Sequence, residues 1–254
     1  GNYDYLMGAD LDFGNEETVQ EVTSWLYWYI NLTKINGLRL DAVKHIPASF
    51  YKNLLPKIYH DFNKELFTVG EYWHGDVYHL ERYLKEVNFE MSLFDVPLHY
   101  HFYDASHNEN YDFSHIFDQT LVSMYPSNAV TFVDNHDTEP SQSLASFIPD
   151  WFKGHAYCLT LLRKPGYPCV FYGDLEGIDY ENISSKKEML QQLLSLRKQY
   201  TEGNQEDYFD HPHLIGWVRC TQTKAMAIIM TNSTGGIKSM YVGKEYSHCY
   251  YVNV

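Results

Sequence analysis

Short apolar segments rich in β-prone residues alternate with helical stretches along most of this chain. The β-prone segments fall at residues 37–41, 66–70, 93–98, 129–133 and 168–172. The helical stretches lie at residues 49–60, 77–87, 114–125, 141–163 and 185–200. Strands that recur about every 30 residues, with a helix between each pair, are typical of βα units. The pattern therefore predicts an α/β fold with a parallel sheet in residues 1–202.

A further helix precedes the first of these strands. Asn15, followed by Glu16 and Glu17, is an N-cap with acids in the first turn, and Gly37 is expected to end the helix. A closed (β/α)8 barrel needs eight strands, and only five are predicted here. The pattern alone leaves two alternatives open, an open five-stranded sheet and the back portion of a barrel.

The alternation of strand-like and helical segments stops after Tyr200. Strand-like segments without intervening helices lie at residues 214–220, 225–231, 238–242 and 248–254. Turn-forming residues, such as Gly235 and Gly236, separate them. We therefore expect a small antiparallel β domain over residues 203–254, and its last strand runs into the end of the chain.

The charge of the chain limits its partners. The sequence holds 33 acidic residues against 19 Lys and Arg, a formal net charge of −14. Such a chain is a poor partner for nucleic-acid phosphates or anionic membranes, and no apolar run approaches the roughly 18 residues of a membrane span. The four cysteines are widely spaced and include no CxxC pair, which slightly favours the cytoplasm over secretion.

Acidic residues follow three of the five predicted parallel strands. Asp41 and Glu71 end the first two segments, and the segment at 129–133 runs into the acidic stretch 134–137. A single acid at such a place often only caps the next helix. Three acids at the carboxyl ends of three parallel strands indicate a site, because ligands bind there in α/β folds and crowded carboxylates repel one another.

The first two of these acids have different neighbours. Arg39 and Asp41 lie two apart on a strand, so their side chains share a face, and the arginine is expected to keep the carboxylate ionised. Glu71 has no cation within three residues and stands beside Tyr72 and Trp73. An apolar setting raises the pKa of a carboxylic acid and suits a proton donor. One carboxylate and one carboxylic acid are what glycosidic cleavage requires.

Four motifs at the strand ends resemble those of a known family. GLRLDAVKH (37–45), VGEYW (69–73), FVDNHD (132–137) and GYPCVFYGD (166–174) are similar, in this order, to motifs of the α-amylase family of glycoside hydrolases. The resemblance covers essentially the whole chain. It implies a partial (β/α)8 barrel holding strands 4–8, followed by an incomplete antiparallel β domain.

The resemblance also assigns roles to the strand-end residues. Asp41 matches the nucleophile, Glu71 the general acid/base and Asp137 the third carboxylate, which stabilises the transition state. The implied reaction is the retaining hydrolysis of internal α-1,4-glucosidic bonds in starch, glycogen and maltooligosaccharides.

Further residues are expected to contact the α-glucan substrate. Arg39 matches the arginine that orients the nucleophile, and His136 matches the histidine that bonds the sugar at the point of cleavage. Lys44 and His45 match residues on the leaving-group side. Aromatic side chains supply platforms on which sugar rings stack, and Tyr72 and Trp73 are the two that we expect to do so.

Calcium is the cofactor that the resemblance implies. Asp4, Asp10 and Asp12 crowd a short loop, which by spacing alone indicates no more than a solvated acidic segment. In the family, however, Asp4 and Asp10 match ligands of a structural calcium that also binds the backbone carbonyl of His45. Asp12 matches a ligand of a neighbouring metal site that only some members have.

The sequence departs from the family pattern in one large respect. The motifs of the first three barrel strands are absent, so we expect a missing N-terminal barrel segment to be needed for a complete site and this chain alone to be poorly active. A non-catalytic or vestigial glucan-binding fragment and a transglycosylase of the same family remain as alternatives. A metal-dependent hydrolase is disfavoured because it would need histidine ligands where Asp41 and Glu71 stand.

Overall fold

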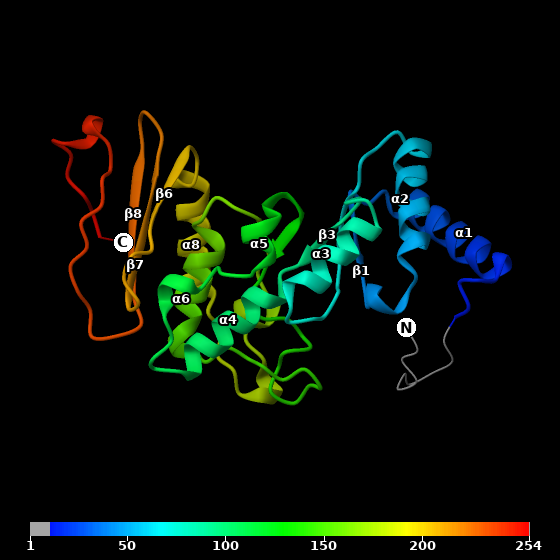
Figure 1. Ribbon diagram of the computed structural model, residues 1–254, viewed down its shortest axis with the longest axis horizontal. Helices are drawn as coiled ribbons and strands as arrows, with labels where there is room; N and C mark the ends of the chain where they lie inside the picture. Colours follow the sequence, from blue (N-terminus) through cyan, green and yellow to red (C-terminus); the bar gives the residue numbers. More distant parts are fainter. Residues whose placement is uncertain (1–10, 254) are drawn as a thin grey trace.

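The core of the fold is a sheet of five parallel strands (Figure 1). The structure is a computed structural model that describes residues 11–253. The strands are β1 (Gly37–Leu40), β2 (Phe67–Gly70), β3 (Ser92–Phe94), β4 (Ala129–Thr131) and β5 (Tyr167–Pro168), which pair in sequence order. This is the parallel sheet that the spacing of apolar segments predicts, with β1 and β5 at its two edges.

Helices connect successive strands of this sheet, and further helices lie before its first strand and after its last. They are α1 (Glu16–Thr33), α2 (Ala48–Asp61), α3 (Val77–Glu86), α4 (Val96–His107), α5 (Leu121–Met124), α6 (Asp150–Leu161), α7 (Tyr172–Glu176) and α8 (Lys187–Tyr200). Short 3-10 turns are η1 (Val43–His45), η2 (Phe113–His115), η3 (Pro126–Asn128), η4 (Asp179–Glu181) and η5 (Lys244–Tyr246). In the part of the chain that the structure describes, no helix combines the length and the apolar character needed to cross a bilayer.

The first helix begins where the sequence predicts and ends earlier than expected. The Asn15 side chain accepts a hydrogen bond from the backbone N–H of Glu17 at 2.9 Å, as an N-cap should. The helix ends at Thr33, because Lys34 adopts a left-handed conformation with φ of 55°. Gly37 has a different role from the one expected. A Cβ there would lie 2.5 Å from the carbonyl oxygen of Phe67, so glycine permits the close approach of β1 to β2.

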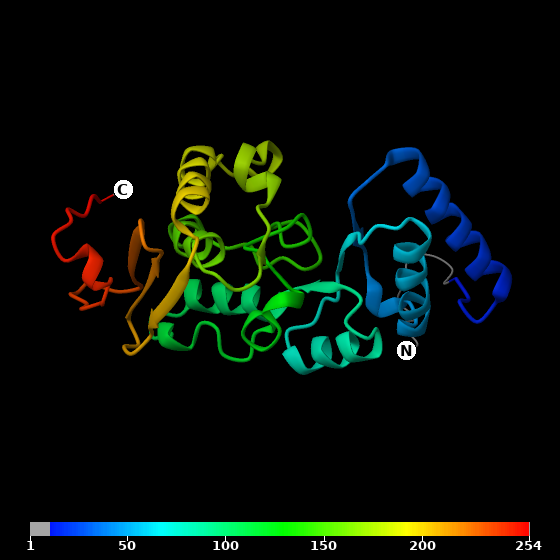
Figure 2. The same cartoon turned by 90° about the horizontal axis from the view of Figure 1, so that it is seen from above.

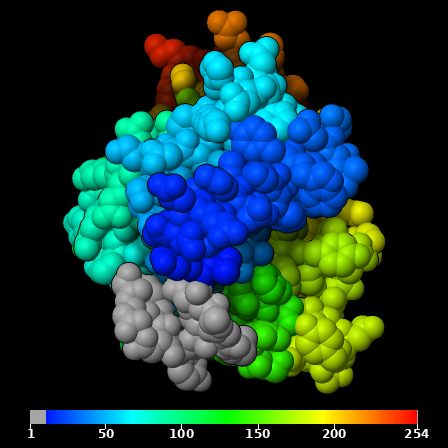
Figure 3. Space-filling view, turned by 90° about the vertical axis from the view of Figure 1, so that its right-hand side faces the viewer, coloured from blue at the N-terminus to red at the C-terminus, as the bar shows by residue number. Residues whose placement is uncertain are grey.

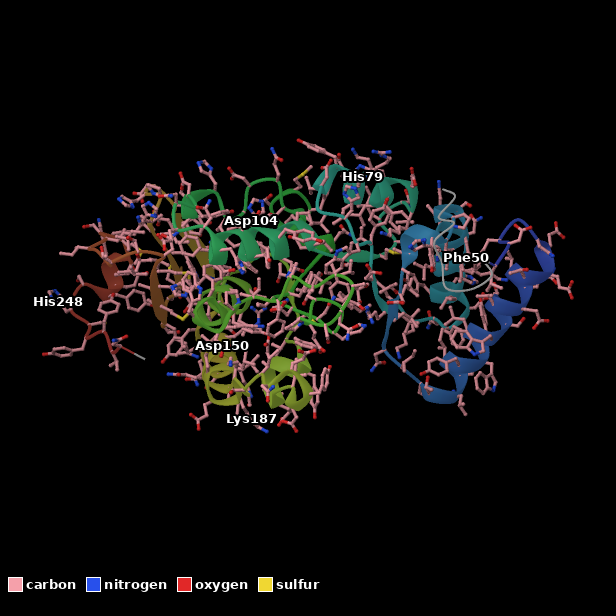
Figure 4. The ribbon with its side chains drawn as sticks, turned by 90° about the horizontal axis from the view of Figure 1, so that it is seen from below. Phe50, His79, Asp104, Asp150, Lys187 and His248 are labelled. Carbon is pink, nitrogen blue, oxygen red and sulfur yellow. The ribbon has the colours of Figure 1, made fainter. Side chains whose placement is uncertain are left out.

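The main hydrophobic core lies between the sheet and the helices that cover it. Leu55 and Ile58 from α2 and Leu80 and Leu84 from α3 are fully buried in it. A smaller buried cluster of Trp73, Val96 and Phe132 packs apart from this core. The Asp150 carboxylate at the start of α6 accepts a hydrogen bond from Lys186, just before α8, at 2.9 Å. Figure 4 shows the starts of these two helices near each other, with Asp150 and Lys187 labelled.

A second sheet of three antiparallel strands follows α8. It contains β6 (Asn204–Tyr208), β7 (Leu214–Cys220) and β8 (Ala225–Thr231), in that order. The predicted strands at 214–220 and 225–231 are correct. The sequence did not indicate β6, because its residues NQEDY are polar and do not alternate with apolar ones. The strands expected at 238–242 and 248–254 do not form within the residues described up to 253, which contain only η5 there.

The molecule is elongated, with the two sheets at different places along its length. Figures 1 and 2 show α1 and α2 at one end and the strands β6–β8 at the other. Phe50 in α2 and His248 in the C-terminal segment mark these ends in Figure 4. Figure 3 looks at the end where α1, in dark blue, faces the viewer.

Candidate active site

Two of the predicted acids follow neighbouring parallel strands, and hydrogen bonds join Glu71 to the residues on either side of Asp41. Asp41 comes directly after β1 and Glu71 directly after β2, and these strands pair with each other. The backbone N–H of Glu71 donates to the carbonyl of Leu40 at 2.8 Å, and that of Val43 donates to the carbonyl of Glu71 at 3.0 Å. The pairing of β1 and β2 therefore continues past the strands and holds the two acids at the same edge of the sheet.

A sharp turn after Asp41 points a backbone N–H at the side chain of Glu71. Ala42 has φ of 48° in the left-handed region, which a residue with a Cβ adopts only at some energetic cost. In this conformation its N–H donates to Oε2 of Glu71 at 2.9 Å. The turn thus fixes the position of the Glu71 carboxyl relative to the residue that precedes Ala42, which is Asp41.

The Asp41 carboxylate pairs with the arginine two residues before it. Nη2 of Arg39 lies 3.1 Å from Oδ1 of Asp41, and the Asp41 side chain is 73% exposed. The guanidinium of Arg39 also lies 5.9 Å from the centre of the Phe94 ring. The shared face predicted from the spacing is therefore present. An exposed pair of this kind contributes little to stability, so its effect is on the orientation of Asp41.

Glu71 is buried, and its pKa is shifted in the direction that the sequence predicts. Its residue exposure is 8%. Burial is the largest effect and raises the pKa of Glu71, and the negative charge of Asp41 raises it further. The hydrogen bond from Ala42 N–H has the opposite effect, because it favours the charged form. The two acids therefore have contrasting surroundings, one buried and one open to solvent.

The residues after Asp41 line a hollow together with a predicted metal ligand. The hollow has a volume of about 590 Å³ and is lined by Asp12, Lys44, His45, Tyr72 and Glu86, among others. Nζ of Lys44 also donates to the carbonyl of Trp73 at 3.3 Å, which ties η1 to the end of β2. Three predicted substrate residues, Lys44, His45 and Tyr72, are thus gathered in one place.

Trp73 lies in the interior rather than on an open surface. It is 8% exposed and packs with Val96 and Phe132. Its indole N–H donates to the hydroxyl of Tyr100 at 3.0 Å. The structure therefore gives no exposed indole face on which a sugar ring could stack, whereas the half-buried Tyr72 borders the hollow.

The third predicted acid lies in the loop after β4. Oδ2 of Asp137 is 3.4 Å from Nε2 of His136, and the Asp137 side chain is 35% exposed. The Asn135 side chain shapes this loop by accepting the backbone N–H groups of Asp137 and Thr138 at 2.8 and 3.1 Å. Because the strands are parallel, this loop leaves the sheet at the same edge as Asp41 and Glu71. The role of Asp137 stays a prediction.

A buried ionic cluster anchors the start of this loop, and sequence reasoning did not find it. Nζ of Lys153 donates to Asp134 at 2.5 Å and to Asp174 at 2.6 Å, and the hydroxyl of Tyr157 donates to Asp174 at 2.6 Å. Burial raises the pKa of Asp134 to about 7. The sequence signal is a lysine among the mainly apolar residues of helix α6, and that signal does not identify its partners.

The described residues contain part of the predicted calcium site. Asp4 and Asp10 lie outside the described residues. Asp12 accepts the backbone N–H of Gly14 at 2.8 Å and lines the same hollow as His45. Within residues 11–253, no group of three or more His, Cys, Asp or Glu is placed to hold a metal ion. Calcium therefore stays a prediction.

Comparison with known proteins identifies relatives over nearly the whole chain. A family model described as the alpha amylase catalytic domain matches residues 3–213. An α-amylase of Geobacillus stearothermophilus is 49% identical over 97% of this chain and 46% of its own length. An α-amylase of Bacillus licheniformis is 46% identical over 96% of this chain and 49% of its length. A cytoplasmic α-amylase of Escherichia coli (strain K12) is 40% identical over 98% of this chain and 53% of its length.

Solved structures agree on the fold. The crystal structure of the α-amylase from Geobacillus thermoleovorans, complexed with acarbose, superposes with a TM-score of 0.68 at 21% identity. The match covers 88% of this chain and 54% of that one. The parallel five-stranded sheet is therefore part of a barrel, which decides between the two alternatives that the pattern left open. The chain spans about half the length of the curated relatives it matches.

Proposed function

This chain belongs to the α-amylase family of glycoside hydrolases, and we propose that it carries the catalytic carboxylates of an α-amylase. The proposed reaction is the hydrolysis of internal α-1,4-glucosidic bonds in starch, glycogen and maltooligosaccharides, with retention of configuration. The observation that carries the proposal is the contrast between a buried Glu71 with a raised pKa and an exposed Asp41 beside Arg39.

The two acids would act in two steps. In the first step the carboxylate of Asp41 attacks the anomeric carbon, while Glu71 donates its proton to the departing glycosidic oxygen, which leaves a covalent glycosyl-enzyme ester. In the second step Glu71, now ionised, takes a proton from water, and that water attacks the anomeric carbon and releases Asp41. The raised pKa of Glu71 supports its role as the proton donor.

The surroundings of Asp41 support its role as the nucleophile. The guanidinium of Arg39 lies 3.1 Å from one carboxylate oxygen and so holds the side chain in one orientation. Retention requires the two carboxyl groups to lie about 5–5.5 Å apart. The hydrogen bond from Ala42 to Glu71 supports such a spacing, because Ala42 is bonded directly to Asp41.

The proposed substrate is an α-glucan. The relative from Geobacillus thermoleovorans is complexed with acarbose, and a structure of AmyP is a complex with maltose. On this chain, Lys44, His45 and Tyr72 line one hollow, and they follow Asp41 and Glu71 closely in the sequence. We propose that they bind the sugar on the leaving-group side, and that His136 and Asp137 bind it from the loop after β4.

We also propose calcium as a structural ion. Carboxylates and backbone carbonyls are the hard oxygen donors that calcium prefers, and Asp12, His45 and Glu86 line one hollow. Asp4 and Asp10 complete the proposed set. The bound ion would supply positive charge that ties the loop before α1 to η1.

Calcium binding is tested by thermal unfolding. We expect CaCl2 to raise Tm and an excess of chelator to reverse the rise, because an ion that binds only the folded state stabilises it. The variant Asp12→Asn should reduce the rise, and Asp61→Asn, which changes an exposed aspartate on α2, should leave it unchanged. Equal rises in both variants, or a rise with MgCl2 alone, would contradict the proposed calcium ligand.

The enzymatic proposal is tested on the purified chain with maltooligosaccharides. We compare the unaltered chain with Glu71→Gln and with Glu65→Gln, which changes an exposed glutamate by the same substitution. Slow hydrolysis that Glu71→Gln lowers by about 100-fold or more, with Glu65→Gln unaffected, would support it. Products longer than the substrate would indicate a transglycosylase. Equal rates in all three proteins, with binding of the sugar retained, would indicate a non-catalytic glucan-binding fragment.

A further inference from the structure

A pocket lined by cationic side chains lies where the ends of α6 and α8 meet the three-stranded sheet. Its volume is about 460 Å³, and its lining includes Arg163, Lys164, Arg197 and Arg219. Arg163 and Lys164 follow α6, Arg197 belongs to the last turns of α8, and Arg219 belongs to β7. No carboxylate is among the residues that line it. The chain has 33 acidic residues and only 19 Lys and Arg. A pocket lined by four cationic side chains and by no acidic one is therefore unexpected.

One of these cations is neutralised within the chain. The guanidinium of Arg163 donates to both carboxylate oxygens of Asp207, each at 2.8 Å. It is also held between aromatic rings, at 4.3 Å from the centre of the Phe117 ring and 4.9 Å from that of Phe209. Arg163 therefore forms a rigid wall of the pocket, and its charge is already balanced by Asp207.

Two other arginines have backbone partners and no acidic partner. Arg197 donates to the carbonyl of Leu161, and Arg219 donates to the carbonyl of Leu162 at 3.5 Å. Across residues 11–253, no carboxylate oxygen lies within 4.0 Å of either guanidinium. Arg219 is only 2% exposed, and its Nε is buried without a hydrogen-bond partner among the described residues. A buried charge without a counter-charge is costly.

The end of helix α6 explains part of this arrangement. Leu161 and Leu162 are the last residues of α6 and its cap, and helix carbonyls attract cations with the equivalent of about half a negative charge. Each arginine, however, has five N–H donors, and among the described residues each makes a single hydrogen bond, to one carbonyl. Burial, followed by the charges of Arg197 and Arg163, lowers the pKa of Arg219. The carbonyls at the end of α6 therefore do not balance the positive charges of Arg197 and Arg219, and most N–H donors of these two arginines remain available to a ligand.

We propose that this pocket binds a tetrahedral oxyanion, namely a phosphate group, through Arg197, Arg219 and Lys164. Arginine forks match the geometry of phosphate oxygens, and a lysine adds a point charge. Lys164 is exposed and supplies a further cation at the rim. The phosphate group belongs either to free inorganic phosphate or to a phosphate monoester of a sugar, because both present the same oxygens.

The proposed site is separate from the candidate active site. Lys164 comes just before β5, so the pocket lies toward the amino-terminal edge of the parallel sheet, whereas Asp41 and Glu71 follow the carboxyl ends of β1 and β2. The pocket also includes Asn204 at the start of β6. A bound phosphate would therefore link α6 and α8 to the three-stranded sheet, and its effect would be on the stability of this junction.

The test measures thermal unfolding of the full chain with inorganic phosphate, with sodium chloride at equal ionic strength as the reference. At a concentration ten times Kd, binding to the folded state should raise Tm by about 3–6 °C over the reference. Isothermal titration with inorganic phosphate gives Kd. The variants Lys164→Gln and Arg197→Gln should each weaken binding by about 10-fold. Arg82→Gln, which changes an exposed arginine on α3, should bind as the unaltered chain does.

Further ligands distinguish the two sources of the phosphate group. If inorganic phosphate and glucose 6-phosphate bind equally, the site recognises the phosphate group alone. If glucose 6-phosphate binds more tightly while glucose does not bind, the site recognises a phosphate monoester. Both results support the proposal. It is overturned if neither phosphate ligand raises Tm above the sodium chloride reference, or if Lys164→Gln and Arg197→Gln bind phosphate as tightly as Arg82→Gln does.

Discussion

Asp41 and Glu71 show how similar positions in a fold give carboxyl groups different properties. Both follow parallel strands, and the same turn connects them through the Ala42 N–H. Asp41 extends into solvent beside Arg39, whereas Glu71 is enclosed. The difference arises from the surroundings of each acid, because burial disfavours the charged form of Glu71. These two acids are therefore suited to opposite roles in acid–base chemistry.

The protonation of Glu71 should depend on Asp41 and Arg39. Burial and the charge of Asp41 raise its pKa, and the charge of Arg39 lowers it. We therefore expect Asp41→Asn to lower the pKa of Glu71 and Arg39→Gln to raise it. The measurement is a titration of the carboxyl groups by ¹³C NMR, in which Glu71→Gln identifies the signal of Glu71.

Asp61→Asn on α2 serves as the control for that titration, since Asp61 is not among the causes of the Glu71 shift. It should leave the titration midpoint unchanged. A Glu71 midpoint at or below that of an exposed glutamate would contradict the expected burial effect. If Glu71 is the general acid, activity should fall as pH rises through its raised pKa, because the proton to be donated is then lost.

The residues next to Glu71 in the sequence were enough to predict its apolar environment. Local sequence could not predict the buried ionic cluster around Lys153. Tyr72 and Trp73 are adjacent to Glu71, so the sequence itself contains the apolar setting. Lys153 instead meets carboxylates that lie 19 and 21 positions away in the chain. Such a contact depends on how α6 packs against the ends of β4 and β5, and no local sequence pattern predicts it.

At the level of elements, one buried aspartate organises two helices. Asp95 follows β3 and accepts the backbone N–H of Leu98 in α4 at 3.2 Å. Its two oxygens also accept the N–H groups of Leu121 and Val122, at the start of α5, at 3.0 and 2.7 Å. The residue is fully buried. One side chain thus satisfies N–H groups at the starts of two helices, which otherwise would have no partners.

We expect Asp95→Ala to lower the free energy of unfolding by about 3 kcal/mol, because three buried N–H groups lose their acceptor. The matched change is Asp76→Ala, at the exposed N-cap of α3, where a single bond to Tyr78 N–H at 2.9 Å is lost. It should cost about 1 kcal/mol. Chemical denaturation of both variants measures the difference, and equal losses would contradict a special role for Asp95.

The stability effect of Asp95 should also depend on pH. Burial raises its pKa from 3.8 to about 6, although the three backbone N–H groups act in the opposite direction. The contribution of such a group is fully present below its unfolded pKa and is lost as pH rises through its folded pKa. The loss caused by Asp95→Ala should therefore be larger at pH 5 than at pH 7, and an unchanged loss would argue against the raised pKa.

The sequence predicted most parallel strands but misplaced the boundary between β3 and α4. Residues 93–98 look like one apolar strand, whereas the structure ends the strand at Phe94 and starts α4 at Val96. The signals for a helix start were present, since Asp95 is an N-cap and Pro97 stands in the first turn. The apolar run outweighed them in the prediction. The prediction missed strand β6 for the opposite reason, because a polar edge strand has no apolar pattern to detect.

At the level of the whole molecule, the end that contains α1 presents apolar side chains to solvent. Trp25, Trp28, Tyr29 and Leu32, which we call the α1 stripe, are each between 38% and 63% exposed. Their spacing places them on one side of the helix, and the rings of Trp25 and Tyr29 are stacked at 5.5 Å. The opposite side of α1 buries Leu26 and Ile30. Among residues 11–253, the strand that follows, β1, pairs with β2 alone and is an edge of the sheet.

An exposed apolar stripe beside an open sheet edge should make the isolated chain self-associate, because both features favour contacts between molecules. We expect Trp28→Glu to weaken this association by about 10-fold or more, as loss of a buried tryptophan does at an interface. Trp151→Glu on α6 is the matched control, since Trp151 is 54% exposed against 57% for Trp28. Sedimentation velocity over a range of concentrations measures the association. If both variants associate equally, the α1 stripe is not the contact surface, and the open edge of β1 becomes the surface to alter next.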